Sequence, residues 1–397
     1  MDVVRLAVAA LAVALVVAVC APAAALEPYE TVLASRQNAG DGGAPHHGNP
    51  PLDVELSGNG RFVVFTAEST NLAPGVTDAT RRAVYLRDLD AGTTSVVAND
   101  AFSPSISHDG RFVAYDVVQD GIEQVVLRDR MTGATSLVSR ANGADGAPGS
   151  GHSFAPSVSA DGRYVLFQSH AENLDPSPRR GVFLRDTREQ RTVRLGPVRS
   201  RNWTFWSASL SANGRYAVVT STESYDPCCS EAYRFRVHLH DLRTGRQRVI
   251  YRLNRDGLDQ KTVPSISATG RWVVIEVPYR GMSIYDARKR SLRLVSRRPV
   301  VRRGERPTIS ANGRYVAFSA TGRSLRGIGY AWLFDRRRGR LDLASRESGR
   351  RGASMRGYAA RLSADGRVVA FGSKVHDRLS DGPHDDAEQV FARRVLP

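Results

Sequence analysis

One short segment occurs seven times along this chain and restricts the folds open to it. Each copy has serine, one variable residue, then Asn, Asp or Thr, followed by glycine and arginine. The glycines are separated by 50, 52, 52, 56, 43 and 53 residues and are Gly60, Gly110, Gly162, Gly214, Gly270, Gly313 and Gly366. A period of this length is typical of the blades of a β-propeller.

The chemistry of each copy predicts a tight hairpin. Asn-Gly and Asp-Gly pairs favour a type I′ turn, with positive φ at both central residues, between antiparallel strands. Thr269-Gly270 is the one weaker copy. The residues after each turn, such as 164–167, are apolar at successive positions. A strand of that kind is covered on both faces, as in a sheet packed between two neighbours.

In six of the units, the next strand after the one that follows the hairpin ends in aspartate. These residues are Asp88, Asp129, Asp186, Asp241, Asp286 and Asp335. Six equivalent catalytic acids would serve no reaction, so we expect a structural role. A carboxylate at this place can accept hydrogen bonds from the N–H groups of the turn that follows.

These patterns predict an all-β fold, a seven-bladed β-propeller of four-stranded antiparallel blades, in one domain spanning residues 26–397. The last unit, 359–394, supplies only three strands, whereas residues 30–36 resemble the outer strand at 134–140. We therefore expect the N-terminal strand to complete the last blade and close the ring, which protects sheet edges. Six blades with one stray motif is the alternative.

Residues 1–25 have the pattern of a secretory signal peptide. Arg5 precedes an apolar run at 6–20, and alanines at 23–25 offer a cleavage site. The run is shorter than the ~20 residues that span a bilayer. We therefore predict an exported protein, secreted or periplasmic and associated with the cell envelope, with no membrane span after cleavage.

Outside the cytoplasm, the adjacent Cys228 and Cys229 could form a vicinal disulfide or remain a thiol pair. They are too few for a zinc site without nearby histidines. The acidic loop at Asp381, Asp385 and Asp386 is the candidate for Ca²⁺, although ordinary solvated loop chemistry is favoured. The sequence predicts no cofactor.

The repeat resembles that of the TolB-like, WD-repeat-related propellers of bacterial envelopes. Their blades carry a Pro-Ser-Ile-Ser-x-Asp-Gly-Arg-Tyr-Val-Ala-Phe hallmark, which residues 104–115, 156–167 and 264–275 match closely. The resemblance covers nearly all of residues 27–397. It implies the propeller fold, and it implies roles as varied as protein docking, sugar binding and peptidase gating.

The net charge of +16 is concentrated in one basic sector. Residues 287–367 hold 22 Arg or Lys against 5 Asp or Glu. Clustered guanidinium groups favour partners with phosphate or carboxylate groups. Arginine accounts for 53 of the 56 basic residues, so a coding bias without function is the alternative. The candidate binding residues of this sector are Arg297, Arg298, Arg302, Arg303, Arg306, Arg350 and Arg351.

Trp203 and Trp206 lie before an inner strand and form the second candidate binding surface. Packing of a tryptophan between blades is an equally weighted interpretation.

No motif of a nucleophilic serine, zinc site or phosphate-binding loop occurs, so the chain has no predicted catalytic residue. The sequence favours a non-catalytic, exported binding scaffold, a monomer whose partner is a protein or an anionic cell-envelope polymer, not nucleic acid. The alternative is a propeller enzyme, a polysaccharide lyase, hydrolase or lactonase with its site at the channel mouth.

Overall fold

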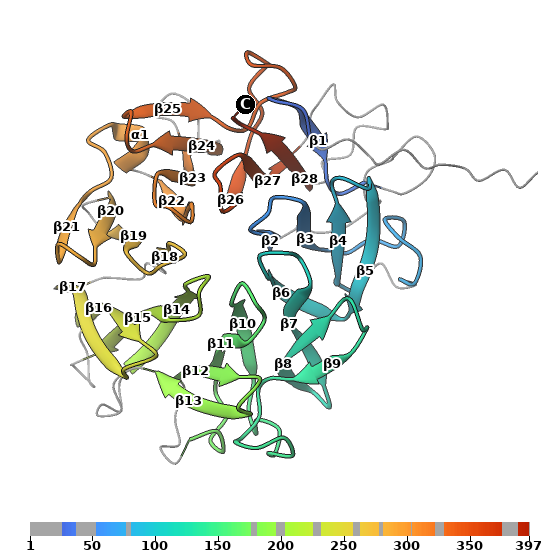
Figure 1. Ribbon diagram of the computed structural model, residues 1–397, viewed down its shortest axis with the longest axis vertical. Helices are drawn as coiled ribbons and strands as arrows, with labels where there is room; N and C mark the ends of the chain where they lie inside the picture. The colour runs from blue at the N-terminus through green and yellow to red at the C-terminus, as the bar shows by residue number, and fades with distance from the viewer. Residues whose placement is uncertain are drawn as a thin grey trace, which may run out of the picture.

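Seven four-stranded antiparallel sheets surround a common axis (Figure 1). This architecture confirms the prediction of an all-β, seven-bladed propeller. The computed structural model describes residues 26–36, 53–76, 81–175, 181–195, 203–224, 232–256, 263–277, 281–302, 304–321, 329–374 and 388–396. Residues 1–25, the predicted signal peptide, lie outside this range. Within it, no helix has the length and apolar character of a membrane span.

Each blade is numbered by its place along the chain. Blade 1 contains β2 (Val54–Leu56), β3 (Phe62–Ala67), β4 (Ala83–Asp88) and β5 (Thr93–Asn99). Blade 2 contains β6 (Ala101–Ile106), β7 (Phe112–Gln119), β8 (Ile122–Asp129) and β9 (Thr135–Leu137). Blade 3 contains β10 (Ser153–Val158), β11 (Tyr164–Ser169), β12 (Gly181–Asp186) and β13 (Arg191–Leu195).

The remaining blades follow the same order. Blade 4 contains β14 (Trp203–Leu210), β15 (Tyr216–Ser224), β16 (Ala232–Asp241) and β17 (Arg246–Asp256). Blade 5 contains β18 (Ser265–Ile266), β19 (Trp272–Val277), β20 (Gly281–Asp286) and β21 (Ser291–Leu294), and a short helix α1 (Pro299–Arg302) follows it. Blade 6 contains β22 (Glu305–Ile309), β23 (Tyr315–Thr321), β24 (Gly329–Asp335) and β25 (Arg340–Leu343). Blade 7 contains β26 (Tyr358–Leu362), β27 (Val368–Lys374), β28 (Glu388–Arg394) and β1 (Thr31–Leu33).

Antiparallel order divides the ring into two faces. The repeated hairpins join the first two strands of each blade, and in blades 1 to 6 a second turn joins the last two, so both lie at the same end of the strands. We call this end the turn face. The links between the middle strands and the connectors between blades lie at the other end, the connector face.

The repeated turn differs from the predicted type I′ turn. In these seven turns of the described chain, the glycine of the Asx-Gly or Thr-Gly pair has a positive φ, as in Gly162 at 72°, but the residue before it does not. Gly162 N donates to Ser159 O, and Asp161 Oδ1 accepts from Arg163 N. The connection is longer than the two-residue loop of a type I′ hairpin. The side chain of Asp161 can therefore organise the turn, and only the glycine needs the left-handed conformation.

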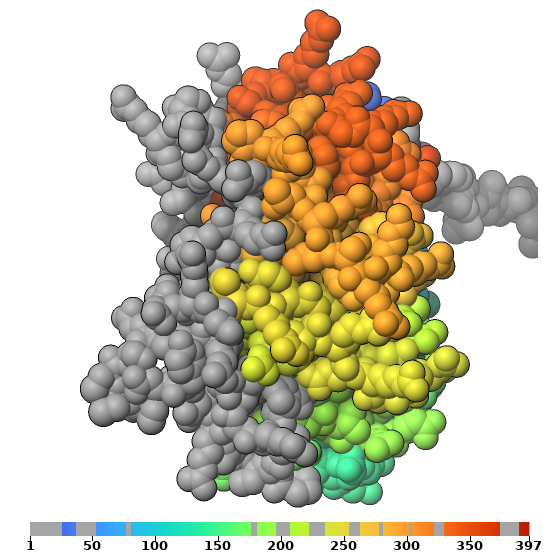
Figure 2. All heavy atoms as spheres, turned by 90° about the vertical axis from the view of Figure 1, so that its left-hand side faces the viewer, coloured from blue at the N-terminus to red at the C-terminus, as the bar shows by residue number. Residues whose placement is uncertain are grey.

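The apolar core consists of seven clusters in the described chain, each between two neighbouring blades. Strand β3 explains why: Val63 and Phe65 pack against blade 7, whereas Phe62 and Val64 pack against blade 2. The consecutive apolar residues therefore cover both faces of one sheet, as their pattern predicts. Figure 2 shows the outer surface over blades 4 to 6, in yellow and orange, as one closely packed wall.

Blade 7 combines both ends of the described chain. Strand β1 pairs antiparallel with β28, so that Thr31 lies opposite Arg393. On the turn face, backbone hydrogen bonds join the hairpin of each blade to that of the next, and Ala364 N donates to Gly58 O, 2.8 Å away, between blades 7 and 1. The first and last blades are thus connected in the same way as the others.

Three blades hold a connector loop through a buried arginine. Arg185, only 1% exposed, donates to the carbonyl oxygens of Ala141 and Gly143 and to Thr192 Oγ1. Thr192 in turn donates to the carbonyl of Arg140. The same relation of arginine, threonine and preceding carbonyl occurs at Arg87, Thr94 and Arg36, and at Arg393, Thr31 and Arg346.

Candidate functional site

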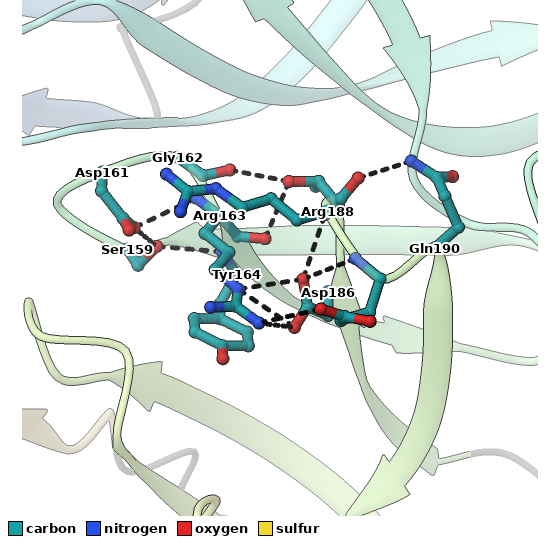
Figure 3. Close-up of polar contacts among 10 residues, drawn as sticks. Ser159, Asp161, Gly162, Arg163, Tyr164, Asp186, Arg188 and Gln190 are labelled. Atoms are coloured by element: carbon teal, nitrogen blue, oxygen red, sulfur yellow. Dashed lines mark hydrogen bonds and ion pairs between the residues drawn. The ribbon is translucent and has the colours of Figure 1, made fainter.

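On the turn face, each hairpin is tied together by its own side chains. Blade 3 illustrates the arrangement in Figure 3: Ser159 Oγ donates to Asp161 Oδ1 at 2.7 Å and accepts from Tyr164 N at 3.0 Å. The serine and the Asx residue of the repeat therefore define the path of the chain. The side chain of the arginine that follows takes no part in this network and extends to a neighbouring turn.

That arginine binds the aspartate that ends the third strand. Arg163 Nη2 lies 2.8 Å from Asp186 Oδ2, while Asp186 Oδ1 accepts from the N–H groups of Arg188 and Glu189. The predicted role of the aspartates in the second turn is thereby confirmed. Their arginine partner was not predicted. The equivalent pairs are Arg61 with Asp88, Arg111 with Asp129, Arg215 with Asp241, Arg271 with Asp286, and Arg314 with Asp335.

These pairs keep the carboxylates ionised. The hydrogen bond from Arg111 lowers the pKa of Asp129 to about 2, and the hydrogen bond from Arg215 likewise lowers the pKa of Asp241. Each aspartate therefore neutralises the arginine of its own repeat. A net positive charge on this face must come from further arginines.

Blades 4 and 5 depart from the pattern. In blades 1, 2, 3 and 6 the arginine also donates through Nε to its aspartate. Arg215 and Arg271 reach their aspartates only through Nη2, at 2.9 and 3.4 Å, and Nε of each is buried without a partner in the described chain. Blade 5 also carries Thr269 where the other turns have Asn or Asp. Local departures from a repeat are expected at functional or strained sites.

A groove of about 860 Å³ lies at this place, between blades 4 and 5. Its lining includes one acidic residue, Asp241, together with Thr244, Gln247 and Thr269. It also includes six arginines, namely Arg215, Arg243, Arg246, Arg248, Arg271 and Arg288. We call it the arginine groove. Arg215 and Arg271 have aspartate partners, and the other four form no ion pair with the described residues, so the groove is suited to an anion.

The predicted basic residues lie elsewhere. Arg297 and Arg298 precede α1, Arg306 is in β22, and Arg350 and Arg351 are in the connector after β25; all five side chains are exposed. Because these segments lead into inner strands, they belong to the connector face. The fold therefore separates them from the arginine groove, and their binding role stays a prediction.

Several other predicted residues are outside the described part. Arg303 is outside it, as is the side chain of Arg302. Trp203 and Trp206 lie within the inner strand β14 and not before it as predicted, and their side chains are outside the described part. The same holds for the predicted cysteine pair and the predicted Ca²⁺ loop, that is, Cys228, Cys229, Asp381, Asp385 and Asp386.

Sequence reasoning missed the arginine groove because its lining comes from two blades. One signal was available: Thr269-Gly270 was the exceptional turn, and Arg243, Arg246 and Arg248 lie close together in the sequence of the preceding blade. Only the packing of blade 4 against blade 5 brings these segments together.

Among the described residues, Ser221 and His238 form a contact of the kind found in nucleophilic catalysis. Ser221 Oγ lies 3.0 Å from His238 Nε2, and Gln247 Nε2 lies 2.5 Å from His238 Nδ1. Burial lowers the pKa of His238 to about 4, and Ser221 is fully buried. A substrate has no route to this serine, and the third residue is an amide rather than a carboxylate.

The described residues form no cluster of three or more His, Cys, Asp or Glu that could hold a metal ion. Burial raises the pKa of two carboxyl groups, Asp116 and Glu276, to about 7. Perturbed carboxyl groups can serve as general bases. Asp116, however, is only 3% exposed. Its pKa is raised by burial and by the nearby carboxyl groups of Glu123 and Asp53.

Together, the seven sheets and the repeated turn network define a β-propeller repeat protein with a basic groove on its turn face. No protein-family model and no curated protein matches the chain. The β-propeller domain of the Trilobed protease from Pyrococcus furiosus is similar in structure, with a TM-score of 0.57 and 11% identity over 87% of this chain and 95% of that domain. The expected propeller is confirmed at the level of the fold.

Two further solved structures are similar. An oligogalacturonate lyase in complex with manganese matches with a TM-score of 0.55 and 12% identity, over 94% of this chain and 98% of the lyase. TolB from Acinetobacter baumannii matches with a TM-score of 0.41 and 20% identity, over 62% of this chain. The match spans 53% of the TolB chain. At these identities the similarity concerns the fold.

Proposed function

We propose that this protein is a non-catalytic binding scaffold that holds a carboxylate-bearing ligand in the arginine groove. The observation that carries the proposal is the groove's charge, six arginines with a single lining aspartate. Guanidinium groups bind carboxylates through paired hydrogen bonds, and four of the six Arg–Asp pairs of the repeat use this same chemistry within the protein.

The proposal includes export, because residues 1–25 have the pattern of a signal peptide. N-terminal sequencing of the protein recovered outside the cytoplasm should then begin at Leu26. An envelope location would place the groove where acidic polymers are abundant partners.

Binding of a galacturonate trimer to the mature protein, measured by calorimetry, tests the function. The double variant Arg246→Ala/Arg248→Ala should weaken binding by about tenfold or more, which corresponds to ~1.4 kcal/mol. The double variant Arg297→Ala/Arg298→Ala removes the same charge from the connector face and should bind as the parent does. Loss in the connector variant alone would transfer the site to the predicted basic sector, and absence of binding by the parent would refute the proposal.

The alternative is a polysaccharide lyase or hydrolase, since an oligogalacturonate lyase has a similar fold. Incubation of the protein with galacturonate oligomers should leave them intact if the protein is a scaffold. Appearance of shortened or unsaturated products, absent from a matched blank, would favour the enzyme.

A further inference from the structure

A second, smaller groove lies on the same face, between blades 3 and 4. Its volume is about 320 Å³, and its lining includes Tyr164, Asp186 and Arg191. We call it the blade 3–4 groove. Both grooves border the hairpin at residues 213–215, which forms the wall between them.

Three residues line both grooves, namely Asn213, Arg215 and Arg243. The two grooves are therefore neighbours across a single hairpin instead of independent sites. Arg191 extends the line of arginines from blade 5 through blade 4 to blade 3. We call the set Arg191, Arg215, Arg243, Arg246, Arg248, Arg271 and Arg288 the arginine strip.

The acidic residues among the groove linings do not cancel this charge. Asp186 accepts from Arg163 and from two backbone N–H groups, and Asp241 accepts from Arg215 in the same manner. Arg191, Arg243 and Arg246 form no ion pair with the described residues. A ligand that follows the strip thus meets several cationic groups in succession.

The surface of the strip does not suit a protein partner. Tight protein interfaces depend on apolar or aromatic anchors. In the described chain, the exposed large hydrophobic side chains are Val118 and Met131, both in blade 2. None lies on the strip, which disfavours a protein as the ligand.

The tyrosines of the grooves are also occupied. The Arg163 guanidinium lies 4.9 Å from the centre of the Tyr164 ring, and Gly214 packs against the same ring. Tyr216 lies in the same way between Arg215 and Gly270. Recognition must therefore depend on charge and on polar groups, of which Thr244 and Thr269 offer hydroxyls to the hydroxyl groups of a sugar.

Resting on the proposed function, we propose that the ligand is a linear acidic polysaccharide that crosses the hairpin of blade 4 and places carboxylates in both grooves. Once one carboxylate is bound, the next is held at high effective concentration near the second groove. Affinity should then rise steeply with chain length, without any change in the chemistry of a single contact.

Galacturonate oligomers of increasing length, titrated into the mature protein at fixed ionic strength, test this inference. From trimer to decamer we expect the Kd to fall by about 100-fold. Arg191→Ala should abolish most of this gain while leaving the Kd of the trimer unchanged, because the trimer can bind in the arginine groove alone. Arg188→Ala, an exposed arginine of the same turn that lines neither groove, is the matched control and should keep the gain.

The outcomes separate the two proposals. Trimer binding with no gain in length, or a gain that survives Arg191→Ala, would overturn the two-groove ligand and leave the anion-binding function intact. No binding of any oligomer would refute the function itself. Polyphosphate or DNA of equal charge that binds as tightly as the decamer would overturn the assignment to a polysaccharide.

Discussion

Arg361 Nε donates a hydrogen bond to Glu55 Oε1 over 2.7 Å, which connects the inner strand of blade 7 to that of blade 1. At the corresponding place in other blades, a serine hydroxyl accepts from the next inner strand, as Ser105 does from Val158 N. The pair therefore replaces a neutral contact with a charged one between the first and last blades.

Loss of this pair should destabilise the ring. Arg361→Gln should lower the free energy of unfolding by about 1 kcal/mol, because the arginine is mostly buried and its partner half-exposed. Urea unfolding measures the change. Arg356→Gln, an exposed arginine of the preceding connector, should have no effect, and Glu55→Gln should remove the sensitivity to Arg361→Gln in a double-mutant cycle.

The buried arginine of blade 3 should matter more. Arg185→Met removes the described donor to the carbonyl of Ala141 and leaves that of Gly143 with only the longer bond from Gly146 N, so we expect a loss of about 2–4 kcal/mol in urea unfolding. Arg128→Met in blade 2 removes a single described hydrogen bond, to Val97 O, and should cost about 1 kcal/mol. Equal losses in both variants would contradict the role assigned to Arg185.

Contacts between blades make some turn glycines irreplaceable. At Gly313, with φ of 73°, an added Cβ would lie 2.1 Å from the ring of Trp272 in blade 5. Gly339, which lies in blade 6 like Gly313, has φ of 63° but open space around it. Gly339→Ala should cost about 1 kcal/mol from backbone strain alone. Gly313→Ala should cost about 1–3 kcal/mol more, from the clash between blades, as measured by thermal unfolding.

The buried Asp116 predicts a dependence of stability on pH. Burial raises its pKa to about 7, and Glu123 and Asp53 add to the shift, while Ser103 and Ala155 N oppose it by hydrogen bonds. The folded state thus binds a proton that the unfolded state has released, so this group's contribution falls as pH rises through the interval up to about 7. Asp116→Asn should raise the Tm at pH 8 and leave it nearly unchanged at pH 4.

The exposed Asp120, which directly follows the same strand, gives the control for this measurement. Asp120→Asn should reproduce the parent's pH profile. If Asp116→Asn shifts the Tm equally at both pH values, packing rather than titration would explain its effect.

Much of the fold could be predicted because its information is local. The Asx-Gly turn, the doubly apolar strand after it and the aspartate at the end of the third strand each involve a few consecutive residues. The type of turn could not be predicted from the Asx-Gly pair alone, since Ser159 and Asp161 act together across the whole hairpin to set it. The arginine of the repeat was visible in every copy, but its aspartate lies 23 residues away in blade 3, and a pairing at that distance exists only once strands have paired.

The sequence by itself favoured seven blades over six, because turn chemistry and strand periodicity act within each repeat, and the seven sheets of the structure decided between the two counts. Tertiary structure alone decided where charge accumulates. It separated Arg297 and Arg298 from Arg246 and Arg248, placing the first two on the connector face and the others on the turn face. A groove between blades belongs to no single repeat, so its lining follows from how neighbouring sheets pack around the axis.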